Sequence, residues 1–198
     1  MIRAFLFDIG NVIVRFDFSK ALRAISDLSD VPDEAGALVR IDESKLRYED
    51  GQITRAEFLD QAFTLLKYRG SEARFIAAWQ GIFTANAPMH TLIERLAARH
   101  PIFLLSNTND MHVEGLFRDF PVFRHISGGT YSHTARASKP HPRIYRIACE
   151  QHGLTPADTL FVDDLADNIA TAHELGFQTH HYHPDRHAAL LEKISPIA

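Results

Sequence analysis

The sequence predicts an α/β protein with a mainly parallel, Rossmann-like sheet of five strands and an inserted all-helical segment. Three observations support this fold class. Uninterrupted apolar runs such as Ala4-Phe5-Leu6-Phe7 are typical of strands buried on both faces of a parallel sheet. Amphipathic helical stretches alternate with such runs in the second half of the chain. Roughly sixty residues of helical pattern separate the first two runs, which is far more than an ordinary crossover needs.

The expected strands are short, and each ends at polar or flexible residues. They cover residues 4–7, 102–105, 123–126, 159–162 and 177–182. Helices are expected where apolar residues recur every three or four positions. In the second half of the chain they cover residues 88–97, 111–117, 142–151, 166–175 and 185–194. Gly153 and Gly176 follow two of them and are typical helix ends.

Residues 17–83 are expected to form a helical cap, inserted into an α/β core domain made of residues 1–16 and 84–198. One helix is expected over residues 33–47. Thr54 and Glu57 form a capping-box pattern before a second apolar stripe. Ser71 can cap a third helix.

The composition is that of an ordinary globular protein. The 198 residues are 45% hydrophobic and 23% charged, enough for a packed core. A net charge of -4 and the lack of a basic stripe argue against a nucleic-acid partner. No apolar stretch is long enough for a membrane span, and no signal peptide is recognised. The single cysteine, Cys149, is interpreted as a buried hydrophobe, and a reducing cytoplasmic location is expected.

Polar clusters follow three of the expected strands, and a lysine precedes one of the expected helices. The clusters are Asp8, then Ser106 and Asn107, then Asp163 and Asp164, and the lysine is Lys139. The carboxyl ends of parallel strands lie along one edge of a sheet, so these side chains should meet in one crevice. Carboxylates gathered there need a cation between them, and their hard oxygen atoms suit Mg²⁺. The hydroxyl, amide and ammonium groups can clamp a phosphoryl group, which an ionised Asp8 could attack in line.

Four segments resemble, in order, the motifs of the haloacid dehalogenase (HAD) superfamily. They are Phe7-Asp8-Ile9-Gly10-Asn11-Val12, Leu104-Leu105-Ser106-Asn107-Thr108-Asn109, Ser138-Lys139-Pro140 and Val162-Asp163-Asp164-Leu165-Ala166-Asp167-Asn168. The resemblance spans almost the whole chain. It is greatest to the bacterial glucose-1-phosphate phosphatase-like branch, which is also similar to the N-terminal phosphatase domain of soluble epoxide hydrolase.

The resemblance implies a role for each matching residue. Asp8 would be the nucleophile and, with the Gly10 carbonyl and Asp164, a ligand of Mg²⁺. Asp163 and Asn168, and less so Asp167, would support the metal site. Ser106, Asn107 and Lys139 would bind the phosphoryl group, and Lys139 would also offset the charge of Asp8.

Gly10 departs from the family pattern. Most phosphatases of this superfamily carry a second Asp there, which protonates the leaving group and then activates water. General acid catalysis typically contributes 10² to 10⁴-fold, so its loss matters most for a poor leaving group. A sugar 1-phosphate releases a more acidic hemiacetal oxygen and needs less help. Asp17 or a residue of the cap could replace the missing acid.

The sequence therefore favours a Mg²⁺-dependent phosphatase acting on a small phosphorylated metabolite, such as a hexose 1-phosphate. A metal-independent 2-haloacid dehalogenase is one alternative, because relatives with that activity also lack the second Asp. A catalytically weak protein that binds phosphate or a partner is another. The sequence leaves the oligomeric state open. It also leaves open a role for the C-terminal histidines, His180, His181, His183 and His187.

Overall fold

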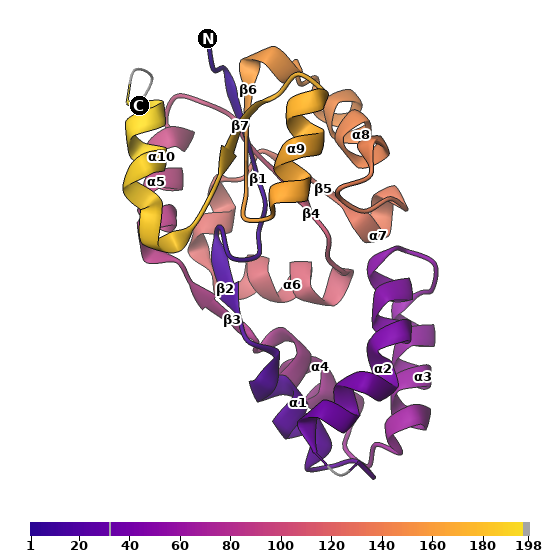
Figure 1. Cartoon of the computed structure of the whole chain (residues 1–198). Helices are drawn as coiled ribbons and strands as arrows, with labels where there is room; N and C mark the ends of the chain where they lie inside the picture. Colours follow the sequence, from indigo (N-terminus) through magenta and orange to yellow (C-terminus); the bar gives the residue numbers. More distant parts are fainter. Residues whose placement is uncertain (32, 196–198) are drawn as a thin grey trace.

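The computed structural model describes residues 1–31 and 33–195. It consists of an α/β part, at the top of Figure 1, and a helical part below it. A two-stranded ribbon connects the two parts. The first and last segments of the chain both lie in the α/β part.

A five-stranded parallel sheet forms the centre of the α/β part, as the sequence predicts. Its strands lie in the order β5-β4-β1-β6-β7, and each neighbouring pair is parallel. Their bounds are β1 (Ala4–Phe7), β4 (Ile102–Ser106), β5 (Gly128–Tyr131), β6 (Thr159–Asp163) and β7 (Gln178–His181). The central strand β1 is fully buried, which explains its uninterrupted apolar sequence.

Helices cover both faces of this sheet. Phe5 and Phe7 of β1 share one hydrophobic cluster with α5 (Ala87–Ala97) and α10 (His187–Ile194). Leu6 points to the other face, where it shares a cluster with α8 (Pro142–His152) and α9 (Ala166–Glu174). Side chains that alternate along β1 therefore contribute to two separate hydrophobic cores, one on each face of the sheet. The α/β part also holds α6 (Asp110–Asp119), α7 (Ser132–Ala135), and the short 3-10 turns η1 (Pro121–His125), η2 (Pro156–Asp158) and η3 (Pro184–Arg186).

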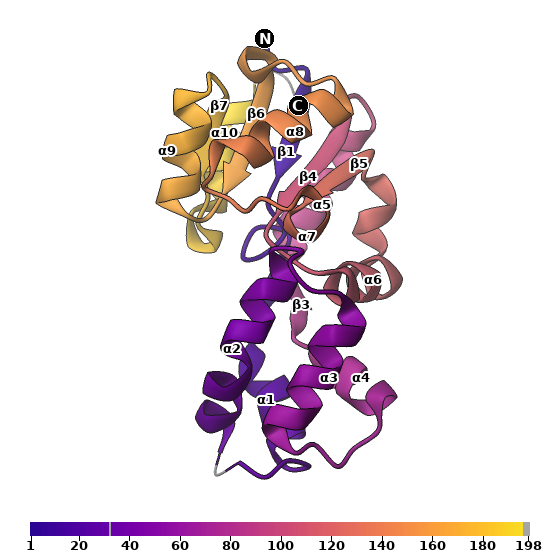
Figure 2. The same cartoon turned by 90° about the vertical axis from the view of Figure 1, so that its right-hand side faces the viewer.

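The helical part has its own hydrophobic cluster, built around Trp79 and Phe58. It contains α1 (Phe18–Ser26), α2 (Glu34–Glu49), α3 (Arg55–Leu66) and α4 (Glu72–Gln80). Thr54 and Glu57 form the predicted capping box of α3, and Ser71 caps α4. In Figure 2 these helices lie together at the end of the molecule away from the sheet, with one end of α2 approaching the α/β part.

The ribbon between the two parts is a feature that the sequence did not indicate. Strand β2 (Val14–Phe16) pairs antiparallel with β3 (Phe83–Ala85), and Phe16 faces Phe83. The chain therefore enters and leaves the helical part through two hydrogen-bonded strands. More than sixty residues of sequence separate the two paired strands, so no local pattern predicts their pairing.

One expected strand is wrong. Residues 123–126 lie mostly in the 3-10 turn η1, and the edge strand instead follows as β5. The strand sequence Gly-Gly-Thr-Tyr lacks an apolar run. A side chain on Gly128 would lie 2.9 Å from the His152 ring of α8, so close helix packing requires glycine there.

No helix in the described ranges is long and apolar enough to cross a membrane. Cys149 is half-buried in α8, where burial raises the pKa of its thiol. A raised pKa favours the protonated thiol over the thiolate, although the side chain is only half-buried and not fully buried as the sequence predicts.

Candidate active site

The carboxyl ends of two neighbouring strands bring the three predicted acids together. Asp8 follows β1, and Asp163 ends the adjacent strand β6, with Asp164 next in the chain. Each of the three offers a carboxylate oxygen within 4.8 Å of those of the other two. Within the described part of the chain, this is the one group of acidic, histidine or cysteine side chains with metal-ligand spacing. The C-terminal histidines form no such group among the described residues.

Lys139 lies between two of these carboxylates. Its ammonium nitrogen is 2.8 Å from Asp8 Oδ1 and 2.6 Å from Asp163 Oδ2, and its side chain is only 2% exposed. Burial by itself lowers the pKa of Lys139, but the two carboxylates outweigh it and raise that pKa above its ordinary value. Lys139 therefore stays charged at neutral pH.

Asp8 has an unusual ionisation for a carboxyl group. Burial raises its pKa to about 6, against the attraction of Lys139, while the nearby Asp163 also raises it. Burial likewise raises the pKa of Asp164, and a hydrogen bond from Asn11 opposes that shift. The acids are thus held together at an electrostatic cost that a further cation would relieve.

Asp163 is saturated with hydrogen bonds. Its Oδ2 accepts from Lys139, while its Oδ1 accepts from the Leu165 backbone at 2.8 Å and from Asn168 Nδ2 at 2.9 Å. These bonds hold the turn between β6 and α9. The supporting role of Asp163 and Asn168 at a metal site stays a prediction, and Asp167 is exposed in the first turn of α9.

Asp164 is positioned by two residues to which the sequence analysis gave no role. Asn11 Nδ2 donates to Asp164 Oδ2 at 3.0 Å, and His181 Nε2 contacts the Asp164 carbonyl at 2.9 Å. Asn11 has a φ of 54°, a left-handed conformation that Asn tolerates well. The Gly10-Asn11 turn is the sequence signal that could have drawn attention to Asn11. No local signal points to His181, because its contact with Asp164 depends on the pairing of β7 with β6.

Ser106 is the last residue of β4, and Asn107 follows it. Ser106 is buried at the strand end, and its hydroxyl helps to stabilise the charged form of Asp8. Both polar atoms of the Asn107 side chain bind the backbone of Lys139: Nδ2 donates to its carbonyl at 2.9 Å, and Oδ1 accepts from its N–H at 2.8 Å. Asn107 thereby fixes the segment that carries the lysine.

The donor set fits a magnesium ion. Asp8 and Asp164 supply hard carboxylate oxygens, Gly10 has a backbone carbonyl in the adjoining turn, and a single ammonium faces three carboxylates. A divalent cation would balance the remaining negative charge. Soft ligands, which would favour another metal, are not part of this group of described residues.

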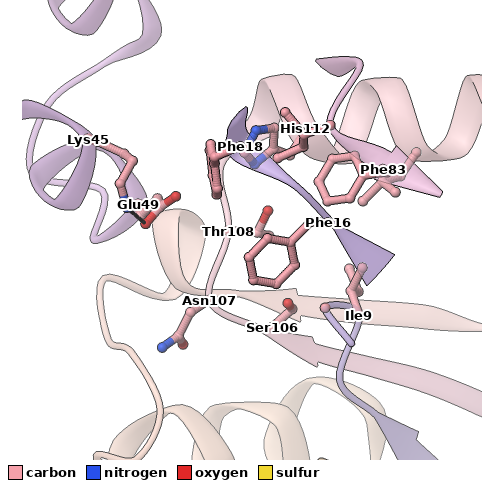
Figure 3. Close-up of a pocket in the computed structure, with 13 residues that line it drawn as sticks. Ile9, Phe16, Phe18, Lys45, Glu49, Phe83, Ser106, Asn107, Thr108 and His112 are labelled. Carbon is pink, nitrogen blue, oxygen red and sulfur yellow. Dashed lines mark hydrogen bonds and ion pairs between the residues drawn. The ribbon is translucent and has the colours of Figure 1, made fainter. Parts of the chain in front are cut away.

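A cavity of about 250 Å³ opens beside this cluster, between the α/β part and the helical part (Figure 3). Ser106, Asn107 and Thr108 form its polar side, and the helix α2 contributes Lys45 and Glu49. The remaining lining residues are mostly apolar: Ile9, Gly10, Phe16, Phe18, Ile82, Phe83, His112 and Leu116. The cavity can therefore enclose a small molecule with one polar end at the strand ends.

Phe16 of the ribbon covers Gly10. A Cβ atom on Gly10 would lie 3.0 Å from Phe16 Cε1, closer than such atoms normally approach. The aromatic ring thus occupies space beside the position where most family members carry the second Asp. The sequence also offers Asp17 as a replacement for the missing acid. Asp17 is the exposed N-cap of α1, and its side chain accepts a hydrogen bond from the Ser19 backbone N–H.

The C-terminal end of α2 is attached to the α/β part next to the site. Ser132 Oγ donates to the Glu49 carbonyl at 2.5 Å and accepts from the Thr108 N–H at 2.9 Å. Ser138, the neighbour of Lys139, donates to Asp50. Gly51 adopts a φ of 66°, and a Cβ there would collide with the His133 carbonyl. The helical part is therefore held against the site.

Comparison with known proteins identifies the family. A model of haloacid dehalogenase-like hydrolases matches residues 2–176. The chain is 28% identical over 206 residues to a D-ribitol-5-phosphate phosphatase of Bacteroides thetaiotaomicron, covering 100% of this chain and 98% of that protein. A (S)-2-haloacid dehalogenase of Burkholderia cepacia is 25% identical over 62% of this chain and 53% of its own length.

Solved structures give the same picture. A HAD family enzyme of Bacteroides thetaiotaomicron superposes with a TM-score of 0.81 at 28% identity, covering 90% of this chain and 92% of that one. The same enzyme in complex with magnesium and inorganic phosphate superposes with a TM-score of 0.78 at 27% identity, covering 91% and 93%.

Proposed function

The chain belongs to the haloacid dehalogenase-like hydrolases, and on this premise we propose that it is a magnesium-dependent phosphatase acting through an aspartyl-phosphate on Asp8. One observation carries the proposal. The buried contact of Lys139 with Asp8 and Asp163, beside Asp164, gathers three carboxylates and an ammonium at one edge of the sheet, as the proposed nucleophile and metal ligands require. The matched phosphatase, and the relative's complex with magnesium and phosphate, support it.

In this mechanism Asp8, the Gly10 carbonyl and Asp164 would hold Mg²⁺. When bound, the ion would neutralise phosphoryl charge and keep Asp8 ionised. Ser106 and Lys139 would bind the phosphoryl oxygens, and Asn107 would keep Lys139 in place. Asp8 attacks phosphorus in line, the ester oxygen leaves, and water then hydrolyses the aspartyl-phosphate.

We propose a sugar or polyol phosphate as the substrate. The similar phosphatase acts on D-ribitol 5-phosphate, and the cavity beside Ser106 is small, partly polar and partly apolar. The helical part, as a cap, would select the substrate and exclude bulk water. The hexose 1-phosphate favoured by the sequence stays a prediction, to be compared directly with pentitol phosphates.

Phosphate release from a panel of sugar, polyol, nucleotide and aryl phosphates tests the proposal. We expect turnover that requires Mg²⁺, stops with EDTA and is lost in Asp8→Asn. Asp60→Asn, an exposed acid on α3, is the matched control and should retain full activity. Hydrolysis by Asp8→Asn at the parental rate would contradict the assignment of the nucleophile.

A 2-haloacid dehalogenase is the second candidate, favoured by Gly10 and by the dehalogenase relatives. The cluster of three carboxylates argues against a dehalogenase. Dehalogenation needs no metal, and Asp163 and Asp164 would repel each other without one. Chloride release from 2-chloropropionate in the presence of EDTA would support this candidate. A protein with neither activity would instead be a phosphate- or partner-binding member of the family.

A further inference from the structure

We propose that Glu49, supplied by the helical part, is the acid that protonates the leaving group and the base that then activates water. This inference rests on the proposed phosphatase function. The site needs such a group because Gly10 has no side chain to carry a proton and the ring of Phe16 lies against it. A proton carrier must therefore reach the site from elsewhere in the fold.

Glu49 faces the site. It lines the same cavity as Gly10, Ser106 and Asn107, and Figure 3 shows its side chain beside Lys45 at the edge of that cavity. The Glu49 side chain is 18% exposed, and its Oε2 is 3.3 Å from Lys45 Nζ. It is thus a mostly buried carboxyl group that forms an ion pair with Lys45 and borders the cavity.

The position of Glu49 is fixed relative to the catalytic loops. Its own carbonyl accepts from Ser132, whose hydroxyl also binds the Thr108 backbone two residues after Ser106. The next residue, Asp50, binds Ser138 beside Lys139. A general acid needs such constraint, because proton transfer requires hydrogen-bond reach of the leaving oxygen.

Other described side chains at the cavity suit the role less well. His112 of α6 is buried, and burial lowers its pKa to about 3, so its ring is neutral and holds no proton for transfer at neutral pH. Lys45 makes the ion pair with Glu49 and lies over the Phe18 ring. Asp17 is an exposed helix cap.

The surroundings of Glu49 favour its protonated form more than water does. Burial raises the pKa of Glu49, Lys45 lowers it, and Asp50 and Asp42 on the same helix raise it. On neighbouring elements, Arg55 of α3 is engaged by Asp110 and Glu114, and the ring of His133 on α7 binds the Thr108 carbonyl. Across the cavity lies the neutral His112.

Glu49 would transfer a proton in each of the two chemical steps. Asp8 forms a bond to phosphorus while the bond between phosphorus and the leaving oxygen breaks, and the proton of the Glu49 carboxyl passes to that oxygen. The Glu49 carboxylate then takes a proton from water, whose oxygen attacks phosphorus. This releases the Asp8 carboxylate and inorganic phosphate, and Glu49 is protonated again.

The dependence on the leaving group tests the proposal. In pre-steady-state experiments with Mg²⁺ and excess substrate, Glu49→Gln should slow the release of alcohol from ribitol 5-phosphate by about 10² or more. The burst of dinitrophenolate from 2,4-dinitrophenyl phosphate should keep its parental rate, because that anion leaves without a proton. The turnover that follows the burst should slow, because the base is missing. Glu43→Gln, exposed on the same helix, is the matched control and should change neither rate.

A second variant covers the case in which Glu49→Gln does not fold. Lys45→Met removes the cation that lowers the Glu49 pKa, so the alkaline limb of kcat/KM for ribitol 5-phosphate should move to higher pH. Equal slowing of both leaving groups by Glu49→Gln, or an unmoved limb in Lys45→Met, would overturn the role of Glu49. A parent protein that hydrolyses neither ester would instead refute the phosphatase function.

Discussion

Replacing Lys139 by Met removes the only ammonium that contacts the buried acids among the described residues. The lysine nitrogen is 2.8 Å from Asp8 and 2.6 Å from Asp163, with 2% of its side chain exposed. Met has a similar length and no charge, so packing is largely retained. Removing one partner of a buried ion pair typically costs about 3–5 kcal/mol, because a charge is left without compensation. We expect a loss of that size in the free energy of unfolding.

Urea unfolding with EDTA present, at neutral and mildly acidic pH, measures this loss. Without Lys139 the pKa of Asp8 should rise further, so protonation on acidification relieves the repulsion and the deficit should shrink as pH falls. Lys20→Met, exposed on α1, controls for the loss of a surface lysine. A deficit below about 1 kcal/mol, or one independent of pH, would refute the electrostatic account of this cluster.

Three further predictions concern the same region. The folded pKa of Asp8, about 6, exceeds its ordinary value of 3.8; without magnesium the unfolding free energy should therefore fall as pH rises between these values. Calorimetry should also find that added magnesium stabilises the protein more at neutral than at acidic pH. Gly10→Asp should lower the melting temperature, because the new side chain crowds the Phe16 ring. Adding Phe16→Ala should restore the melting temperature. An unchanged melting temperature in Gly10→Asp alone would contradict the close contact between the two residues. Ser132→Ala leaves the Glu49 carbonyl and the Thr108 N–H unpartnered and should cost about 1–3 kcal/mol in urea unfolding, whereas a neutral effect would mean that water replaces the hydroxyl.

The strand ends could be predicted because two local signals coincide there. An apolar run such as Ala4–Phe7 must be buried, and the polar residue that ends it must then lie at the sheet edge. The same reasoning applied to Ser106 and Asp163, and both lie beside Asp8 in the structure. The catalytic roles of these residues stay predictions until activity is measured.

The parts that escaped prediction depend on contacts between distant segments. The Gly128–Tyr131 strand has no apolar run, and its place is set by β4 and by the close packing of α8. The ribbon pairs residues on either side of the helical part. Glu49 belongs to a helix with an unremarkable pattern, and only the attachment of that helix through Ser132 brings it to the cavity.

The ribbon that joins the two parts has a consequence for how such proteins diversify. Because Phe16 and Phe83 pair directly, the segment between them begins and ends at neighbouring positions. A tight turn of two residues could bridge these positions as an ordinary hairpin, without altering the spacing of the sheet. An insert exchanged at this junction, during evolution or by an engineer, would leave Asp8 and the sheet in place but would replace the groups that the insert supplies, Glu49 among them.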